Sequence, residues 1–185
     1  VRHTQTRLPG LVAIEPVVHG DARGFFVESY RASALAEIGI TDTWVQDNHA
    51  RSGRGVVRGL HFAMPPGQAK LIRCATGSIL DVCVDLRRGS PTYGEWEAIE
   101  LDDRSMKMLY IPVGFAHGYC VTSELADVVY KCSDYYDPAL EREISVNDPD
   151  LGITWPVDAP ELSVRDRDAP RLREIADSLP FVFAG

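Results

Sequence analysis

The sequence contains no apolar run approaching the roughly 20 residues that a membrane-spanning helix requires. Residues 1–7 lack the apolar core of a signal peptide, so we expect a cytoplasmic protein that stays out of the membrane. Basic residues are also in deficit, because 19 Lys and Arg against 27 Asp and Glu give a formal net charge of -8. This charge argues against binding to nucleic acids or anionic membranes, although a local basic pocket for a phosphorylated small molecule remains compatible with it.

Cysteine is scarce, and the four cysteines form no Cys-x-x-Cys pair. They stand in apolar, strand-like runs, at Cys74, Cys83, Cys120 and Cys132. We therefore expect reduced, buried cysteines, as in a cytoplasmic protein, and no disulfide framework.

Several catalytic signatures are missing as well. There is no His-x-His pair of the kind that small barrels use for metals, so we expect neither a metal nor another cofactor. No Gly-x-Ser-x-Gly elbow and no glycine-rich phosphate loop of the P-loop or dinucleotide type is present. What remains is acid–base chemistry carried by side chains alone.

What the sequence does have is a long series of short strands. About ten to twelve apolar, partly alternating segments are separated by turn signals every eight to twelve residues, with only two small helices. This pattern predicts an all-β fold, an antiparallel sandwich or barrel such as a jelly roll, forming one domain over residues 1–185. The expected strands include 11–18, 25–30, 44–49 and 56–62, and the expected helices are 33–38, capped by Ser33, and 170–178.

The stretch Gly55 to Arg73 concentrates the chemistry. It holds His61 between apolar neighbours, Arg58 three residues earlier and Lys70 nine residues later. Period-two geometry would place Arg58 on the face opposite His61, and the turn at 64–67 would return Lys70 towards His61. The competing interpretation is that His61 is a buried structural histidine with its hydrogen bonds satisfied, and that Arg58 and Lys70 are charges at the rim.

Candidate acids follow later in the chain. Tyr130 and Tyr136 belong to a tyrosine-rich run, in which each tyrosine taken alone can equally be an aromatic core or rim residue. The aspartates in 163–168 could orient a histidine, or they could form a solvated run of charge.

Several motifs occurring in one order make a resemblance specific. They are Asp21–Glu28, Gln46–Asn48, Val57–His61, Gln68–Arg73, Asp85–Gly94, Ile111–Gly118 and Tyr130–Tyr136. Together they resemble the dTDP-4-dehydrorhamnose 3,5-epimerase family over residues 8–175, nearly the whole chain.

The resemblance implies a metal-free, cupin-type jelly roll that forms a homodimer and acts on a dTDP-linked 4-keto-6-deoxyhexose. The keto group acidifies the protons on both neighbouring ring carbons, so a base can remove one if the enolate is stabilised. The family assigns His61 as this base, oriented by Asp166, and Tyr130 as the proton donor across the ring. Lys70 would stabilise the enolate oxygen.

The resemblance also implies a nucleotide site. Arg23, Arg58 and Lys70 suit the pyrophosphate, while Phe26 and Tyr136 would sandwich the thymine. Further positions that match family residues lining the substrate are Glu28, Gln46, Asn48, His117, Glu141 and Arg165. The chain departs from the family at Glu143 and Val146, where Gly and Trp are usual, and at Arg165, where Lys is frequent.

The predicted function is epimerisation of dTDP-4-dehydro-6-deoxy-D-glucose at carbons 3 and 5, giving dTDP-4-dehydro-L-rhamnose for dTDP-L-rhamnose biosynthesis. Two alternatives stay open. One is a single-centre epimerase of antibiotic deoxysugar synthesis, and the other is a non-catalytic, nucleotide-sugar-binding barrel of the same fold.

Overall fold

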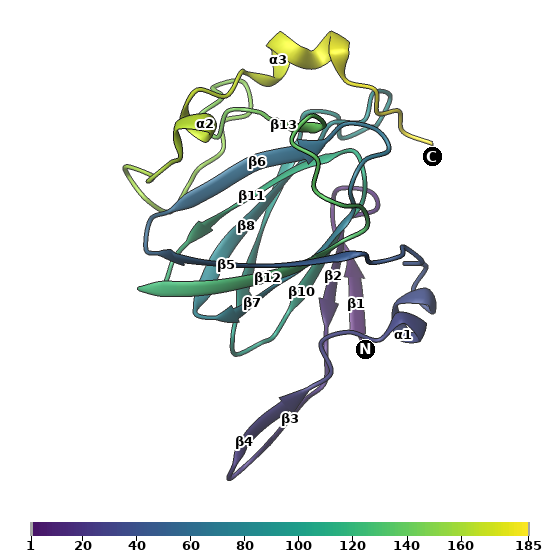
Figure 1. The fold of residues 1–185 in the computed structure, drawn as a ribbon, viewed down its shortest axis with the longest axis vertical. Helices are drawn as coiled ribbons and strands as arrows, with labels where there is room; N and C mark the ends of the chain where they lie inside the picture. Colours follow the sequence, from purple (N-terminus) through teal and green to yellow (C-terminus); the bar gives the residue numbers. More distant parts are fainter. Residues whose placement is uncertain (1, 185) are drawn as a thin grey trace.

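The computed structural model describes residues 2–184, which form a sandwich of two antiparallel sheets with a projecting hairpin (Figure 1). The six-stranded sheet has the order β1-β2-β10-β7-β12-β5. Its strands are β1 (Arg2–Gln5), β2 (Val12–Glu15), β10 (Met108–Ile111), β7 (Lys70–Thr76), β12 (Leu125–Cys132) and β5 (Gln46–Gly53). The antiparallel β-sandwich of jelly-roll type predicted from the sequence is confirmed.

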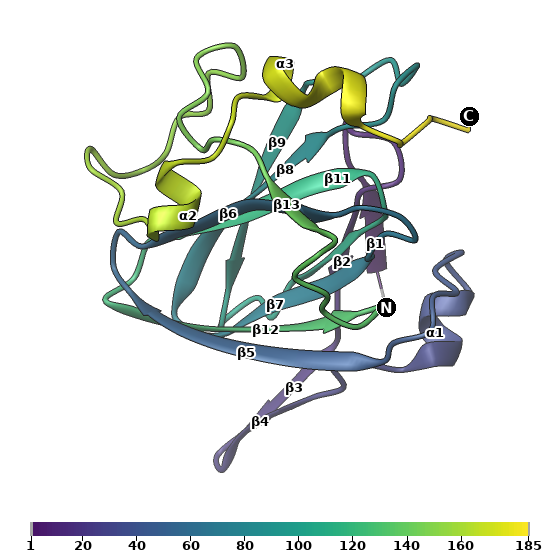
Figure 2. The same ribbon diagram turned by 45° about the horizontal axis from the view of Figure 1, so that its top comes forward.

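The second sheet has five strands in the order β13-β6-β11-β8-β9. They are β13 (Glu141–Glu143), β6 (Val57–Ala63), β11 (Phe115–Val121), β8 (Ser78–Asp85) and β9 (Trp96–Asp102). The short helices α2 (Val164–Arg167) and α3 (Leu172–Ile175), with the 3-10 turn η1 (Ala176–Ser178), lie outside this sheet, above β6 and β11 in Figure 2.

Three apolar clusters hold these layers together. Alternating residues of both sheets, such as Ile72, Tyr119 and Val128, fill the space between them. The C-terminal segment covers the outer face of the five-stranded sheet, and α1 (Ala32–Ala36) covers part of the six-stranded one. Because both sheets also bury apolar residues on their outer faces, strands such as β7, β8 and β11 carry apolar residues on both faces. The four cysteines are all buried and unpaired, as expected.

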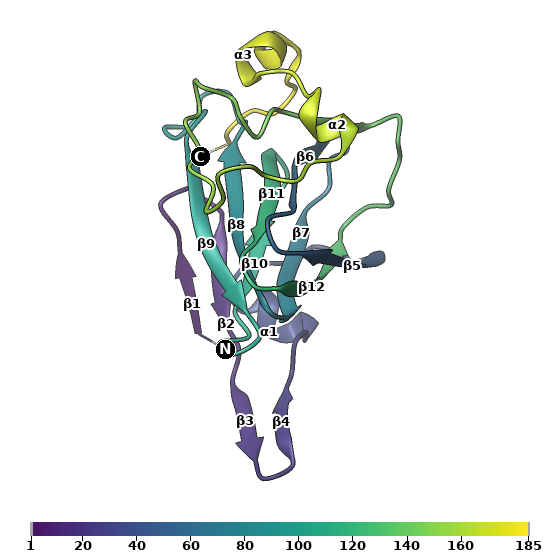
Figure 3. The ribbon, with the colours of Figure 1, turned by 90° about the vertical axis from the view of Figure 1, so that its left-hand side faces the viewer.

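A two-stranded hairpin, β3 (Val18–Asp21) and β4 (Gly24–Val27), extends away from the sandwich (Figures 1 and 3). The sequence predicted one strand over 11–18 and another over 25–30. The structure instead ends β2 before Pro16, begins β3 at Val18 and ends β4 at Val27. Proline cannot donate to a ladder, which explains the break. Phe25 and Phe26 are 60% and 69% exposed at the hairpin.

Other boundaries also differ. The first helix begins after Arg31, so Ser33 lies inside it and is not its cap. The final helix is split into α3 and η1, and no helix was predicted from the sequence where α2 lies. None of the helices in the described range 2–184 is long and apolar enough to cross a membrane.

A β-bulge in β6 decides which residues face the space between the sheets. Arg58 pairs with Tyr119 on β11 and His61 pairs with His117, so β6 advances three residues while β11 advances two. The extra residue reverses the alternation, and Arg58 and His61 come to line the same pocket. The period-two prediction that placed them on opposite faces was therefore wrong.

Candidate active site

The candidate site lies where the inner faces of the two sheets meet the C-terminal segment. From β6 come Arg58 and His61, and from β11 comes His117. The facing sheet contributes Lys70 on β7 and Tyr130 on β12, whose register partner on β5 is Asn48. Packed sheets stand about 10 Å apart, so side chains from these two layers can approach one small ring from opposite sides.

His61 and Asp166 form a hydrogen-bonded pair. Nε2 of His61 lies 2.6 Å from Oδ1 of Asp166, and the side chains are 28% and 5% exposed. A carboxylate accepts a hydrogen bond, so Nε2 carries the proton when the ring is neutral, and Nδ1 keeps a free electron pair. The pair therefore presents a partly exposed basic nitrogen with a fixed ring orientation.

Asp166 reaches His61 because of the local structure of α2. The Ser163 hydroxyl accepts a 3.0 Å hydrogen bond from the Asp166 amide and so caps the helix. Burial acts to raise the pKa of Asp166, but interactions with His61 and hydrogen bonds from Ser163 and Gly59 outweigh it. The net pKa lies below the usual value, which keeps the carboxylate charged.

A pocket of about 320 Å³ opens beside this pair. Its lining includes Arg58, His61, Ser163, Arg165 and Asp166. Arg58 is anchored across the sandwich by a 2.9 Å hydrogen bond from its Nε to the Ser52 hydroxyl on β5. Glu161 also lines the pocket, so two guanidinium groups and two carboxylates surround the base. Arg58, which pairs with the neutral Ser52 hydroxyl, is the cation that can contact an anionic substrate.

His117 forms a second, more deeply buried histidine–carboxylate pair. Its Nε2 lies 2.8 Å from Oδ2 of Asp81 on β8, and Asp81 is fully buried. Asp81 was not among the sequence-predicted site residues. An aspartate alternating with apolar residues in a buried strand was the available signal, because a buried charge needs a partner.

Tyr130 and Lys70 provide the groups on the facing sheet. Burial raises the pKa of the Tyr130 phenol, and the fields of Cys132 and Glu141 add to the effect. A raised pKa keeps the phenol protonated near neutrality and able to give up a proton. Lys70 is 8% exposed and opposes Cys132 on β12.

The predicted amide residues form a chain along one end of β5. Nε2 of Gln46 donates to Oδ1 of Asn48 over 3.0 Å, and Oε1 of Gln46 accepts from the Tyr136 amide over 2.9 Å. Tyr136 remains 54% exposed, and Glu141 lies at the start of β13, opposite Ala63. These residues frame the edge of the site without closing it.

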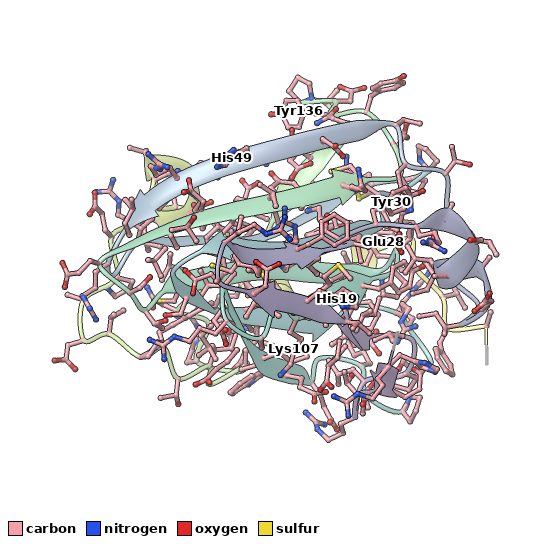
Figure 4. The ribbon with its side chains drawn as sticks, turned by 90° about the horizontal axis from the view of Figure 1, so that it is seen from below. His19, Glu28, Tyr30, His49, Lys107 and Tyr136 are labelled. Atoms are coloured by element: carbon pink, nitrogen blue, oxygen red, sulfur yellow. The ribbon has the colours of Figure 1, made fainter. Side chains whose placement is uncertain are left out.

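Three predicted residues lie outside this cluster. Arg23 and Phe26 belong to the projecting hairpin, and Glu28 follows it. Arg23 is paired with Asp21 on the hairpin itself, and Glu28 with Arg31. Figure 4 shows Glu28 and Tyr136 separated by β5 and β12. The hairpin that carries Phe26 extends away from the sandwich (Figures 1 and 3), so a single chain does not place Phe26 against Tyr136.

Arg165 forms an ion pair with a residue of β13. Its Nε and one terminal nitrogen both contact Oε2 of Glu143, the former over 2.7 Å. Glu143 was not predicted as a site residue. Among residues 2–184, no cluster of three or more His, Cys, Asp or Glu side chains could hold a metal ion.

Comparisons with known proteins show which family the chain resembles. The family model described as dTDP-4-dehydrorhamnose 3,5-epimerase matches residues 5–174. A dTDP-4-dehydrorhamnose 3,5-epimerase of Pseudomonas aeruginosa is 47% identical over 182 residues, covering 97% of this chain and 100% of the relative. A dTDP-4-dehydrorhamnose 3-epimerase of Streptomyces niveus is 46% identical over 173 residues, covering 92% and 84%.

A solved structure extends the similarity to three dimensions. The dTDP-6-deoxy-D-glucose-3,5-epimerase of Legionella pneumophila, in complex with dTDP-4-keto-L-rhamnose, superposes with a TM-score of 0.95 at 45% identity. The alignment covers 99% of each chain.

Proposed function

Because the chain belongs to the dTDP-4-dehydrorhamnose 3,5-epimerase family, we propose that it inverts carbons 3 and 5 of dTDP-4-dehydro-6-deoxy-D-glucose. The product is dTDP-4-dehydro-L-rhamnose, an intermediate of dTDP-L-rhamnose biosynthesis. The observation that carries the proposal is the hydrogen-bonded His61–Asp166 pair beside a pocket that Arg58 also lines. Tyr130 and Lys70, on the facing sheet, are the acid and the cation that we assign to it.

Nδ1 of His61 removes the proton from carbon 3 or carbon 5, and the electron pair moves through the adjacent bond onto the ketone oxygen at carbon 4. The imidazole becomes an imidazolium, whose Nε2–H is held by the Asp166 carboxylate. Lys70 stabilises the enolate oxygen by charge, in a site where burial strengthens the interaction.

Tyr130 then returns a proton to the same carbon from the opposite side of the ring, which inverts the centre. The phenol becomes a phenolate, and proton exchange with solvent restores both groups. The raised pKa of Tyr130 favours this role, since the proton must be present when the enolate forms. Two such cycles, one at each carbon, give the double epimer.

The nucleotide is proposed to extend from this centre towards the edge of β5. Arg58 and Lys70 offer cationic groups for the pyrophosphate, and Tyr136 offers an exposed ring for the thymine. Gln46, Asn48, His117 and Glu141 would line the sugar and nucleotide. Arg165 would approach the pyrophosphate only after exchanging its partner Glu143.

A second copy of the chain would complete the site. Arg23, Phe26 and Glu28 lie on or beside a projecting hairpin with two exposed phenylalanines, and β5 is an open sheet edge. Exposed apolar hairpins and open edges are features that association covers. We therefore propose a homodimer in which each hairpin supplies Arg23 and Phe26 to its partner's Tyr136. The proposed location is the cytoplasm, in keeping with four unpaired cysteines.

The experiment is incubation of the protein with dTDP-4-dehydro-6-deoxy-D-glucose in deuterated water, with carbons 3 and 5 resolved by NMR. Deuterium at both carbons, with inversion, is the expected result. Deuterium at one carbon alone would favour the single-centre alternative. The 3-epimerase of Streptomyces niveus, which is 46% identical to this chain, is a precedent for that activity. Binding of the nucleotide sugar without exchange would leave only the non-catalytic alternative.

A further inference from the structure

A second polar bridge runs beside the His61–Asp166 pair. Glu143 on β13 is the register partner of His61 on β6, and Arg165 immediately precedes Asp166 in α2. The His61–Asp166 hydrogen bond therefore joins α2 to β6, and the Arg165–Glu143 ion pair joins α2 to the neighbouring strand β13 at the same register position. Both side chains are partly shielded from solvent, with Glu143 20% and Arg165 41% exposed.

The helix that carries Asp166 needs such support. α2 has only four residues, too few for a helix to be stable by itself. On its N-terminal side the chain is fixed by two 3.0 Å backbone hydrogen bonds, which join Glu161 to Gly55 and to Val57 at the start of β6. On its C-terminal side the next backbone anchor is the 2.8 Å bond from Ser145 to Pro170. Arg165 binds Glu143 between these anchors, next to the residue that must reach His61.

We propose that Glu143 and Arg165 are positioning residues for the His61–Asp166 pair, holding α2 at the edge of β6 and balancing the charge beside the base. The proposal rests on the proposed function, since it concerns the same catalytic histidine. Glu143 neutralises the charge of the Arg165 guanidinium near His61. Arg165 in turn neutralises the half-buried Glu143 carboxylate, which would otherwise lie unpaired beside the imidazole.

Other charged and titratable groups face His61 from each neighbouring element. They are Arg58 on β6, Glu161 before α2, Asp166 on α2, Glu141 on β13, His117 and Tyr119 on β11, and Lys70 and Tyr130 on the facing sheet. None of these changes when Glu143 or Arg165 alone is neutralised. The two substitutions therefore alter the local charge by one unit in opposite directions against a constant background.

The test compares the pH profiles of kcat/KM for Glu143→Gln, Arg165→Gln and the double variant. The acidic limb reports protonation of the free enzyme's base. Glu143→Gln leaves an uncancelled cation and should move this limb to lower pH, by about 0.5 unit for a partly screened charge. Arg165→Gln leaves an uncancelled anion and should move it to higher pH by a similar amount.

The double variant separates charge from positioning. Its acidic limb should return to the wild-type position because the local charge is balanced again. Its kcat should stay several-fold low, no lower than in either single variant, because one bridge is lost in all three. Arg165→Lys should keep the wild-type limb. Glu124→Gln, which removes the ion-pair partner of Arg54 in the turn before β6, is the matched control and should change neither quantity.

The proposal would be overturned if the acidic limb of the kcat/KM profile stayed in place, or moved in the same direction, in both single variants while they kept wild-type thermal stability. A raised KM with unchanged kcat in Arg165→Gln would also overturn it, since that result would make Arg165 a substrate contact only. Wild-type exchange of deuterium with normal turnover in the same preparation establishes the proposed function independently. A failure of the positioning proposal is thereby distinguished from a failure of the function.

Discussion

A Cβ atom on Gly59 would lie only 2.5 Å from the Cα atom of Gly118 on the neighbouring strand. Gly59 also adopts a φ of +132°, which side-chain-bearing residues rarely tolerate. This close approach accompanies the bulge that brings Arg58 and His61 into one pocket. Two glycines thus set the arrangement of the candidate site.

Replacement of Gly59 by alanine should therefore be severe. We expect a loss of about 3 kcal/mol or more in the free energy of unfolding, because steric overlap adds to backbone strain. Gly39→Ala is the matched control, since Gly39 has φ +85° and a Cβ added there would meet no atom within 4 Å. It should cost about 1 kcal/mol, from strain alone. Equal losses in urea unfolding would contradict the close-packing argument.

Substitution of Asp166 by asparagine should lower kcat by at least about 100-fold, because an amide no longer fixes the ring tautomer or stabilises the imidazolium. The pKa of Asp166 in the folded protein lies below its ordinary value of 3.8. Its carboxylate therefore stabilises the fold above pH 3.8, and this stabilisation is lost as the pH falls through the lower, folded value.

The stability difference between wild type and Asp166→Asn should accordingly be largest at about pH 5 to 7 and shrink as the solution is acidified below about pH 4. Thermal unfolding over this pH range provides the measurement. A difference that grows on acidification would contradict the assigned direction of the pKa shift.

The Tyr119 hydroxyl is buried without a hydrogen-bond partner, the one such side-chain atom among residues 2–184. Removing an unsatisfied buried polar group relieves its desolvation cost, so Tyr119→Phe should stabilise the protein by about 1 kcal/mol. For a chain of this size, the melting temperature should rise by about 2–4 °C. A fall in melting temperature would show that the hydroxyl has a partner in solution.

The proposed exchange of hairpins can be tested by complementation. Chains carrying Phe26→Ala and Arg23→Ala should be nearly inactive, as should chains carrying His61→Asn. When the two mutant chains are co-expressed, about a quarter of the wild-type activity should return. Half of the dimers then contain one chain of each kind, and one of the two sites in such a mixed dimer has both an intact His61 and an intact hairpin. Activity that does not return would mean that each hairpin serves its own chain or none.

The fold class and the main residues of the candidate site could be predicted from the sequence. Alternating apolar residues and closely spaced turns indicated the β-sandwich, since both follow from local geometry. The order of motifs around His61, Lys70 and Tyr130 led to the candidate site. The prediction that Arg58 and His61 lie on opposite faces of β6 was wrong because of the bulge at Gly59. Such a bulge depends on how closely the neighbouring strand approaches.

Contacts between residues far apart in the sequence could not be predicted either. The aspartates in 163–168 could be read as partners of a histidine or as solvated charges, but nothing local indicated that Asp166 would reach His61, 105 positions away. That assignment came from the family resemblance. The partners Asp81, Ser52 and Glu143 were missed because each contact joins separate strands or loops. The projection of the β3–β4 hairpin likewise depends on tertiary packing.

The most direct test of the mechanism is deuterium exchange at carbons 3 and 5 in His61→Asn and Tyr130→Phe, followed by NMR in deuterated water. His49→Asn is the matched control, because Nε2 of His49 also contacts an aspartate, Asp127, over 2.9 Å, but on the outer face of β5. Our account predicts no exchange in His61→Asn, exchange largely without inversion in Tyr130→Phe, and wild-type behaviour in His49→Asn. Exchange at the wild-type rate in His61→Asn would contradict it.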